Sequence, residues 1–127
     1  MTARDPWEDL PPSPPRVVTP TEEEIGRANV LARSGGNCER CGASSAGHWH
    51  HRKTRGRGGD WSAANGLQLC NDCHDWTHRN TGEAYREGLL VRTEADPEDV
   101  PVLLRTRLRG RRWALLDALG NWTEALW

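Results

Sequence analysis

Five histidines are the residues of this chain whose type and spacing could do chemistry. All five fall between His48 and His78, and the rest of the 127-residue chain has none. His74 and His78 are four residues apart, so on a helix both imidazoles would project from one face and could bind one metal ion. His50 and His51 are neighbours, so on a strand they would point to opposite faces, and one could bind metal while the other reacts. Scattered surface histidines, or extra ligands to a zinc ion, are the alternatives, but this spacing favours a metal site with a reactive neighbour.

The four cysteines form two pairs with the spacing of zinc ligands. Cys38 and Cys41 make one pair, Cys70 and Cys73 make the other, and each pair encloses two residues. This spacing lets both sulfurs of a pair reach one tetrahedral ion at about 2.3 Å. Disulfides or a redox motif are the alternatives, but a redox pair belongs in a β-α-β setting that this sequence lacks. We expect one structural Zn²⁺ bound by all four thiolates.

The local sequence predicts that the folded part begins with a helix near residue 21. Thr21 and Glu24 have the capping-box pattern, and Gly35 and Gly36 predict the end of the helix. Residues 1–20 hold six of the eight prolines and little apolar sequence, so we expect a disordered tail there.

A strand, a loop, a second strand and a helix are predicted around the candidate metal ligands. The strands are expected at residues 48–53 and 67–69, and the helix should run through His78. Asn71 or Asp72 is the expected N-cap of this helix, and Gly82 should lie just past its end. On this helix Cys73 and His74 would point about 100° apart, so Cys73 could face the zinc ion while His74 faces the second metal site.

The expected class is α+β, with three parts along the chain. Residues 1–20 are the tail, 21–82 the N-terminal helix and the core with both metal sites, and 83–127 a C-terminal β extension that packs on the core. Strands are predicted in the extension at residues 89–91, 102–104 and 113–116, with turn residues between them.

The stretch from Cys38 to His78 resembles the HNH endonucleases, which have the ββα-metal (His-metal finger) fold. The resemblance covers 41 of 127 residues and rests on the order of the cysteine pairs, the double histidine, Asn65 and the final HxxxH. The segments around Gly58-Gly59 and residues 65–67 also resemble the linker and second strand of that family. The combination of these motifs is specific, whereas each motif alone is weak.

The resemblance implies a role for each residue. His51 would be the general base that activates water, and Asn65 would buttress the loop and orient His51 through hydrogen bonds. His50, where many members have Asp, would bind one catalytic divalent ion (Mg²⁺, Mn²⁺, Ni²⁺ or Zn²⁺) together with His74 and His78. The all-histidine set is most similar to the bacteriocin nucleases, and the cysteine pairs to phage and homing-type members.

The implied activity is hydrolysis of DNA phosphodiester bonds, by nicking or double-strand cleavage, with 5′-phosphate products. The residue types suit that chemistry on general grounds. A neutral imidazole can accept a proton from water near neutral pH, and a divalent ion can neutralise charge on the phosphate. Three imidazoles leave coordination positions open for water and substrate.

Basic residues follow directly after the proposed base. We expect four of them to contact the DNA backbone: Arg52, Lys53, Arg55 and Arg57. Arginine can bind phosphate oxygens through two hydrogen bonds, whereas the alternative is a solvated loop. Five arginines within residues 105–112 are a second, weaker candidate for DNA contact. No segment resembles a base-reading helix, so little sequence preference is expected.

The charge distribution excludes a uniformly basic nucleic-acid binder. The net charge is −1, but residues 1–30 hold six acidic residues, whereas residues 31–82 hold seven basic ones against four acidic ones. No apolar stretch is long enough to cross a membrane, and no hydrophobic segment follows the first methionine. We therefore expect a cytoplasmic monomer, in the host cytoplasm if a phage encodes it.

A short, free-standing, arginine-rich chain of this kind resembles HNH proteins of bacteriophages. That resemblance implies the terminase large subunit as a partner in DNA packaging. The alternative from another class is a catalytically silent, zinc-stapled nucleic-acid or protein adaptor, which would need the cysteines but not His51, Asn65 or His78. A zinc deaminase is excluded because no H-x-E precedes a P-C-x-x-C.

Overall fold

The computed structural model describes Pro11, residues 19–106 and residues 110–125. The tail predicted for residues 1–20 therefore lies almost wholly outside the described residues, as do Arg107 and Arg109 of the second basic stretch. Within the described part of the chain, no helix has both the length and the apolar character needed to cross a bilayer.

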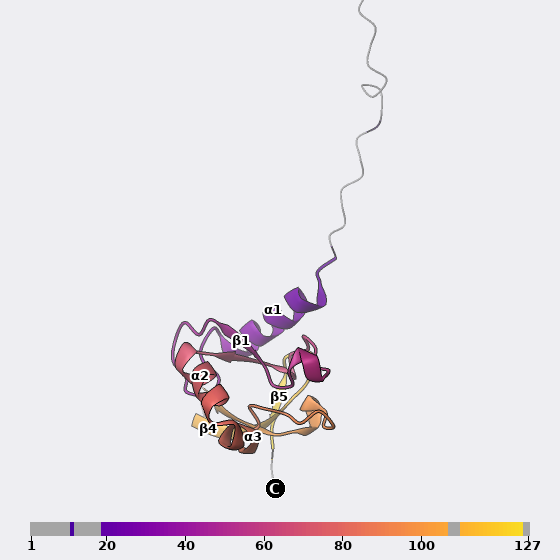
Figure 1. The fold of residues 1–127 in the computed structure, drawn as a ribbon. Coiled ribbons are helices and arrows are strands. Elements are labelled where there is room, and N and C mark those ends of the chain that lie inside the picture. The colour runs from indigo at the N-terminus through magenta and orange to yellow at the C-terminus, as the bar shows by residue number, and fades with distance from the viewer. Residues whose placement is uncertain (1–10, 12–18, 107–109, 126–127) are drawn as a thin grey trace, which may run out of the picture.

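The described chain is a mixed helix-and-sheet structure with two small antiparallel sheets (Figure 1), which confirms the broad class. The elements are α1 (Glu22–Ser34), β1 (His48–His51), β2 (Gly66–Leu69), α2 (Asn71–Arg79), α3 (Thr81–Arg86), β3 (Val102–Thr106), β4 (Gly110–Leu116) and β5 (Trp122–Glu124). Short 3-10 helices lie at Arg55–Arg57 and Pro97–Asp99. One sheet pairs β1 with β2, and the other has the order β3-β4-β5.

Helix α1 begins and ends where the sequence predicts. The hydroxyl of Thr21 accepts a hydrogen bond from the amide of Glu24 at 3.1 Å, and Gly35 ends the helix in the left-handed conformation. Gly26 lets α1 approach the chain at Trp61, because a Cβ at this position would lie 1.8 Å from the Trp61 carbonyl oxygen. This close packing fixes α1 beside the β1–β2 sheet.

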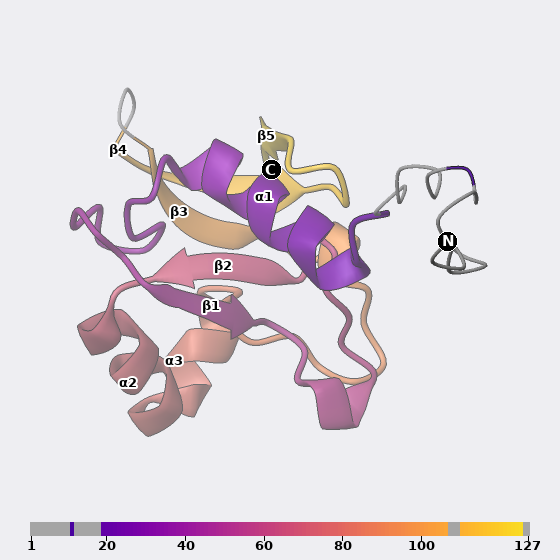
Figure 2. The ribbon, with the colours of Figure 1, turned by 90° about the horizontal axis from the view of Figure 1, so that it is seen from above.

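The β1–β2 hairpin sets which histidine faces which way. His50 pairs with Leu67 and His51 with Gly66, and the strand ends at His51, two residues before the predicted end. Helix α2 contacts both strands. Figure 2 shows α2 and α3 on one side of the hairpin and α1 on the other.

Two boundaries of α2 differ from the prediction. Cys70, not Asn71 or Asp72, is the N-cap, because its sulfur accepts the amide hydrogen bond of Cys73 at 3.4 Å. The helix ends at Arg79, and the chain re-enters helical structure at once, so Gly82 lies inside α3 rather than past a helix end.

The C-terminal strands at 102–104 and 113–116 are confirmed within β3 and β4, but residues 89–91 are not a strand. Leu89 and Val91 are buried, and their amides bond to the carbonyls of Ala84 and Arg52 rather than to a sheet partner. The apolar run thus reflects burial of an irregular segment. The short strand β5 was not predicted.

One hydrophobic cluster joins these elements. It contains two ligand-type cysteines, Cys38 and Cys73, together with apolar side chains from both sheets such as Leu67, Leu104 and Leu116. The cysteines therefore lie at the edge of the core, where a bound ion would connect segments that are distant in sequence.

Two candidate metal centres

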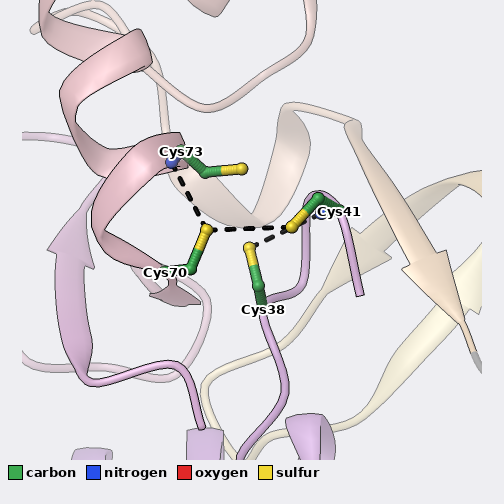
Figure 3. Close-up of side chains that lie close together, drawn as sticks. All are labelled: Cys38, Cys41, Cys70 and Cys73. Carbon is green, nitrogen blue, oxygen red and sulfur yellow. Dashed lines mark hydrogen bonds between the residues drawn. The ribbon is translucent and has the colours of Figure 1, made fainter. Parts of the chain in front are cut away.

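The four cysteines converge as the sequence predicts. Cys38 and Cys41 come from the loop after α1, and Cys70 and Cys73 from the start of α2; Figure 3 shows their sulfurs facing one another. All four ligand atoms lie within 4.8 Å of one another. This arrangement, the cysteine cluster, can hold a metal ion such as zinc.

The sulfur spacing suits zinc better than disulfides. The sulfurs of Cys41 and Cys70 are 3.7 Å apart, and all four cysteines are free. A disulfide would require about 2.05 Å, whereas sulfurs bound to zinc at about 2.3 Å lie about 3.8 Å apart at the corners of a tetrahedron. The disulfide alternative is therefore excluded in this conformation.

Three histidines form a second cluster. His50 from β1 and His74 and His78 from α2 place ligand nitrogens within 4.8 Å of one another. The Nε2 atoms of His74 and His78 are 3.3 Å apart, a spacing that two imidazoles bound to one ion at about 2.0–2.1 Å would have. This histidine cluster reaches the surface at His78, whereas His50 is only 3% exposed.

Hydrogen bonding fixes the tautomer of His50. Its Nε2 lies 2.6 Å from the carbonyl oxygen of Leu89, which can only accept, so Nε2 carries the proton and Nδ1 keeps its lone pair. Burial, together with the charges of the neighbouring histidines, lowers the pKa of His50 to about 4. Burial and His78 also lower the pKa of His74. Both rings are therefore neutral near pH 7, which is the form that binds metal.

His51 lies outside the histidine cluster. Its ring contacts Trp61 edge-on at 4.5 Å between centroids, with Trp49 at 6.1 Å, so it faces the opposite side of β1 from His50. Burial, and then the charges of Arg55 and Arg27, lower the pKa of His51, so the ring is neutral near pH 7. Its Nε2 is buried and, within the described part of the chain, has no hydrogen-bond partner.

Asn65 buttresses the loop after β1. Its side-chain oxygen accepts from the Lys53 amide at 2.7 Å, and its amide group donates to the carbonyls of Lys53 and Asp60, both at 3.0 Å. Among the described residues, no hydrogen bond joins Asn65 to His51. The hydrogen bonds of Asn65 therefore act on the loop that follows His51 rather than on its ring.

Arg52 was predicted to bind DNA, and the structure contradicts this. The side chain is 1% exposed and donates to four backbone carbonyls, those of Ala64, Gly88, Pro97 and Val100. Burial lowers its pKa to about 9, which still leaves the guanidinium charged near pH 7. Arg52 thus ties the turn before β2 to the segments before β3 and cannot reach a phosphate.

We expect Arg52→Ala to lower the free energy of unfolding by about 3–5 kcal/mol, because four buried or half-buried carbonyls would lose their donor. Urea unfolding measures this change. The matched variant Arg55→Ala, at an exposed position, should change stability by less than about 0.5 kcal/mol. Equal small effects of both variants would contradict the structural role of Arg52.

The other three basic residues remain available to a ligand. Arg55 and Arg57 are exposed and Lys53 is half-buried. Arg57 donates to the Tyr85 hydroxyl at 2.9 Å, and Arg55 lies over the Trp61 ring at 5.8 Å. In the second basic stretch, Arg111 and Arg112 lie near the carboxylates of Glu87 and Glu124, respectively.

Some residues near the sites were missed at the sequence level. His48 stacks on His74 with ring centroids 4.8 Å apart and planes 2° apart, and Arg27 from α1 lies 5.1 Å over Trp61. His48 was part of the histidine count but received no role. Arg40 contacts the cysteine cluster through Cys73. Of these residues only His48 lies in the histidine-rich stretch, so only His48 carried a signal in the sequence.

A groove of about 1090 Å³ lies elsewhere, between the end of α1 and the C-terminal sheet, where its lining includes Asn37 and Trp122. It contains no member of the histidine cluster.

Comparison with protein-family models, with curated proteins and with solved structures finds no match to this chain. Function must therefore be inferred from the geometry of the two clusters.

Proposed function

We propose that this chain is a metal-dependent endonuclease of the HNH kind that hydrolyses DNA phosphodiester bonds. The observation that carries the proposal is the convergence of His50, His74 and His78 from one hairpin strand and one helix, beside the cysteine cluster. A silent adaptor would have no need of three imidazoles whose ligand nitrogens lie within 4.8 Å of one another. In this proposal β1, β2 and α2 are the ββα core, and a zinc ion bound by the cysteine cluster would stabilise it.

A divalent ion in the histidine cluster would neutralise charge on the phosphate and help the leaving 3′ oxygen. His50 is oriented for this by Leu89, which leaves Nδ1 as its ligand atom. His48 restrains the ring of His74 by stacking on it. The chain thus presents ligands whose orientations are set before any ion arrives.

His51 is the proposed general base, since it is neutral near pH 7. Its ring lies on the opposite side of β1 from His50, so the substrate phosphate would have to reach around the end of the strand at His51. Because its Nε2 is buried against the indole rings, Nδ1 must take the proton from water, or the ring must turn to bring Nε2 out. Asn65 holds the following loop at Lys53 and Asp60, which restricts where the chain beyond His51 can lie.

A labelled DNA duplex tests this function. Zinc-loaded protein with added Mg²⁺, Mn²⁺ or Ni²⁺ should cleave it, EDTA should stop the reaction, and a ligase should rejoin the 5′-phosphate ends. Intact duplex under every condition, with folded and zinc-loaded protein, would favour the adaptor.

The exposed basic loop is the proposed contact to the DNA backbone. Arg55→Ala should weaken duplex binding and reduce the slope of log K against log salt by about one, since one phosphate contact is lost. Fluorescence anisotropy with a catalytically inactive protein measures both. Arg86→Ala on α3, whose guanidinium pairs with Glu83, is the matched control and should keep the wild-type slope. Equal slopes for both variants would exclude this contact.

The terminase large subunit remains the proposed partner, on the resemblance to phage proteins alone. Co-purification of the two proteins, with an effect of this chain on terminase cleavage, is the expected result. No binding and no effect would remove the packaging role and leave the nuclease proposal intact.

A further inference from the structure

The sulfurs of the cysteine cluster receive hydrogen bonds from two kinds of donor. Three of them accept a hydrogen bond from a backbone amide two or three residues further along the sequence: Cys38 from Cys41 at 3.5 Å, Cys41 from Ala43 at 3.4 Å, and Cys70 from Cys73 at 3.4 Å. These are bonds of the tight turns that present the cysteines. They persist for as long as the turns do.

Cys73 differs because it lies inside α2. Helical amides bond to carbonyls four residues back, as the amide of His74 does with Cys70 at 2.9 Å, so they do not reach the sulfur. The N–H group that reaches Cys73 Sγ belongs to the guanidinium of Arg40, at 3.6 Å. One thiol of the cluster thus depends on a side chain where the others depend on the backbone.

Arg40 is held in this position from two further sides. Its guanidinium carbon lies 3.7 Å from the centroid of the Trp76 ring, and its Nε lies 3.2 Å from a carboxylate oxygen of Glu87. The side chain is 20% exposed and that of Glu87 16%. The guanidinium is therefore fixed beside the sulfur before any ion binds.

Charge gives this contact its importance. Four thiolates around one Zn²⁺ leave a net charge of −2, and the cluster is partly buried. A cation at hydrogen-bonding distance stabilises the thiolate form, and charge-assisted bonds are about twice as strong as neutral ones. Arg40 brings that charge to Cys73, the sulfur that accepts no turn amide from the residues in the described ranges.

We propose that Arg40 is a positioning residue of the zinc site that holds Cys73 as a ligand and sets how fast the zinc ion is released. Without it, Cys73 would be the least restrained of the four ligands, since the other three would still accept their turn amides. The inference concerns zinc retention and does not rest on the nuclease proposal.

The test is zinc transfer from the full-length, zinc-loaded chain to a chromogenic chelator. Arg40→Gln should release zinc about 10–100-fold faster than wild type, because losing a hydrogen-bond partner of a ligand usually costs that factor in metal affinity. Arg40→Lys, which keeps the charge, should restore part of the difference. Arg111→Gln is the matched control, because Arg111 also meets Glu87, at 3.4 Å, but has no bond to a sulfur, and it should behave as wild type.

Alkylation with N-ethylmaleimide, mapped by mass spectrometry, separates this role from general loosening. In Arg40→Gln, Cys73 should be modified first and the other cysteines later. Equal release rates for Arg40→Gln and Arg111→Gln would overturn the proposal. So would simultaneous alkylation of all four cysteines, which indicates unfolding, or a wild-type chain that carries no zinc.

Discussion

Replacing His51 by alanine is expected to lower the rate of DNA cleavage by about 10²- to 10⁴-fold, the usual contribution of a general base. Among the residues that the structure describes, none forms a hydrogen bond with Nε2 of the half-buried ring, and the strand pairing of residue 51 with Gly66 uses only backbone groups. The fold and both metal sites should therefore survive the change. Single-turnover cleavage with saturating Mn²⁺ measures the loss.

Two controls make that result specific. The variant should bind the same number of zinc and manganese ions as wild type and melt at nearly the same temperature. His48→Ala, which removes the ring stacked on His74, should have the smaller effect on the rate. An unchanged rate in His51→Ala would contradict the assignment of His51 as the base.

Removing one thiolate of the cysteine cluster is expected to unfold the chain. Cys38→Ala deletes a side chain that is 1% exposed and belongs to the same hydrophobic cluster as Leu67 and Leu69. Structural zinc sites contribute about 10–16 kcal/mol of apparent binding energy, as much as the whole stability of a typical domain. We expect zinc content near zero and no cooperative thermal transition by circular dichroism.

The exposed Ser44, in the loop after Cys41, provides the matched control. Ser44→Ala should keep its zinc and its melting temperature. A chelator strong enough to remove zinc from wild type should reproduce the Cys38→Ala spectrum. If Cys38→Ala kept a cooperative transition at the wild-type temperature, the zinc site would not be structural.

The features predicted from sequence are those encoded within a few residues. Thr21 and Gly35 cap the two ends of α1 through hydrogen bonds to residues three or four positions away. The two-residue spacing within each cysteine pair brings its sulfurs together. His74 and His78 meet because they are one helical turn apart. The sequence also groups the first cysteine pair with the second, and His50 with His74 and His78, but only through the order of the motifs.

What the sequence could not predict depends on contacts between distant segments. Arg52 belongs to the same basic run as Arg55, yet its partners lie 12 to 48 residues away, and nothing local distinguishes a buried arginine from an exposed one. The link from Arg40 to Cys73 spans 33 residues. Residues 89–91 show the converse, since an apolar run predicts burial but does not specify a strand partner.

The most direct test of the central claim is the rate at which zinc-loaded protein nicks supercoiled plasmid in added Mn²⁺, measured beside His74→Ala. The account predicts nicking that requires the added ion and falls at least about 100-fold in the variant. Zinc content should stay at one ion per chain in both proteins. Plasmid that stays intact with the wild type, or nicking at equal rates by both proteins, would contradict the assignment of the histidine cluster as a catalytic metal site.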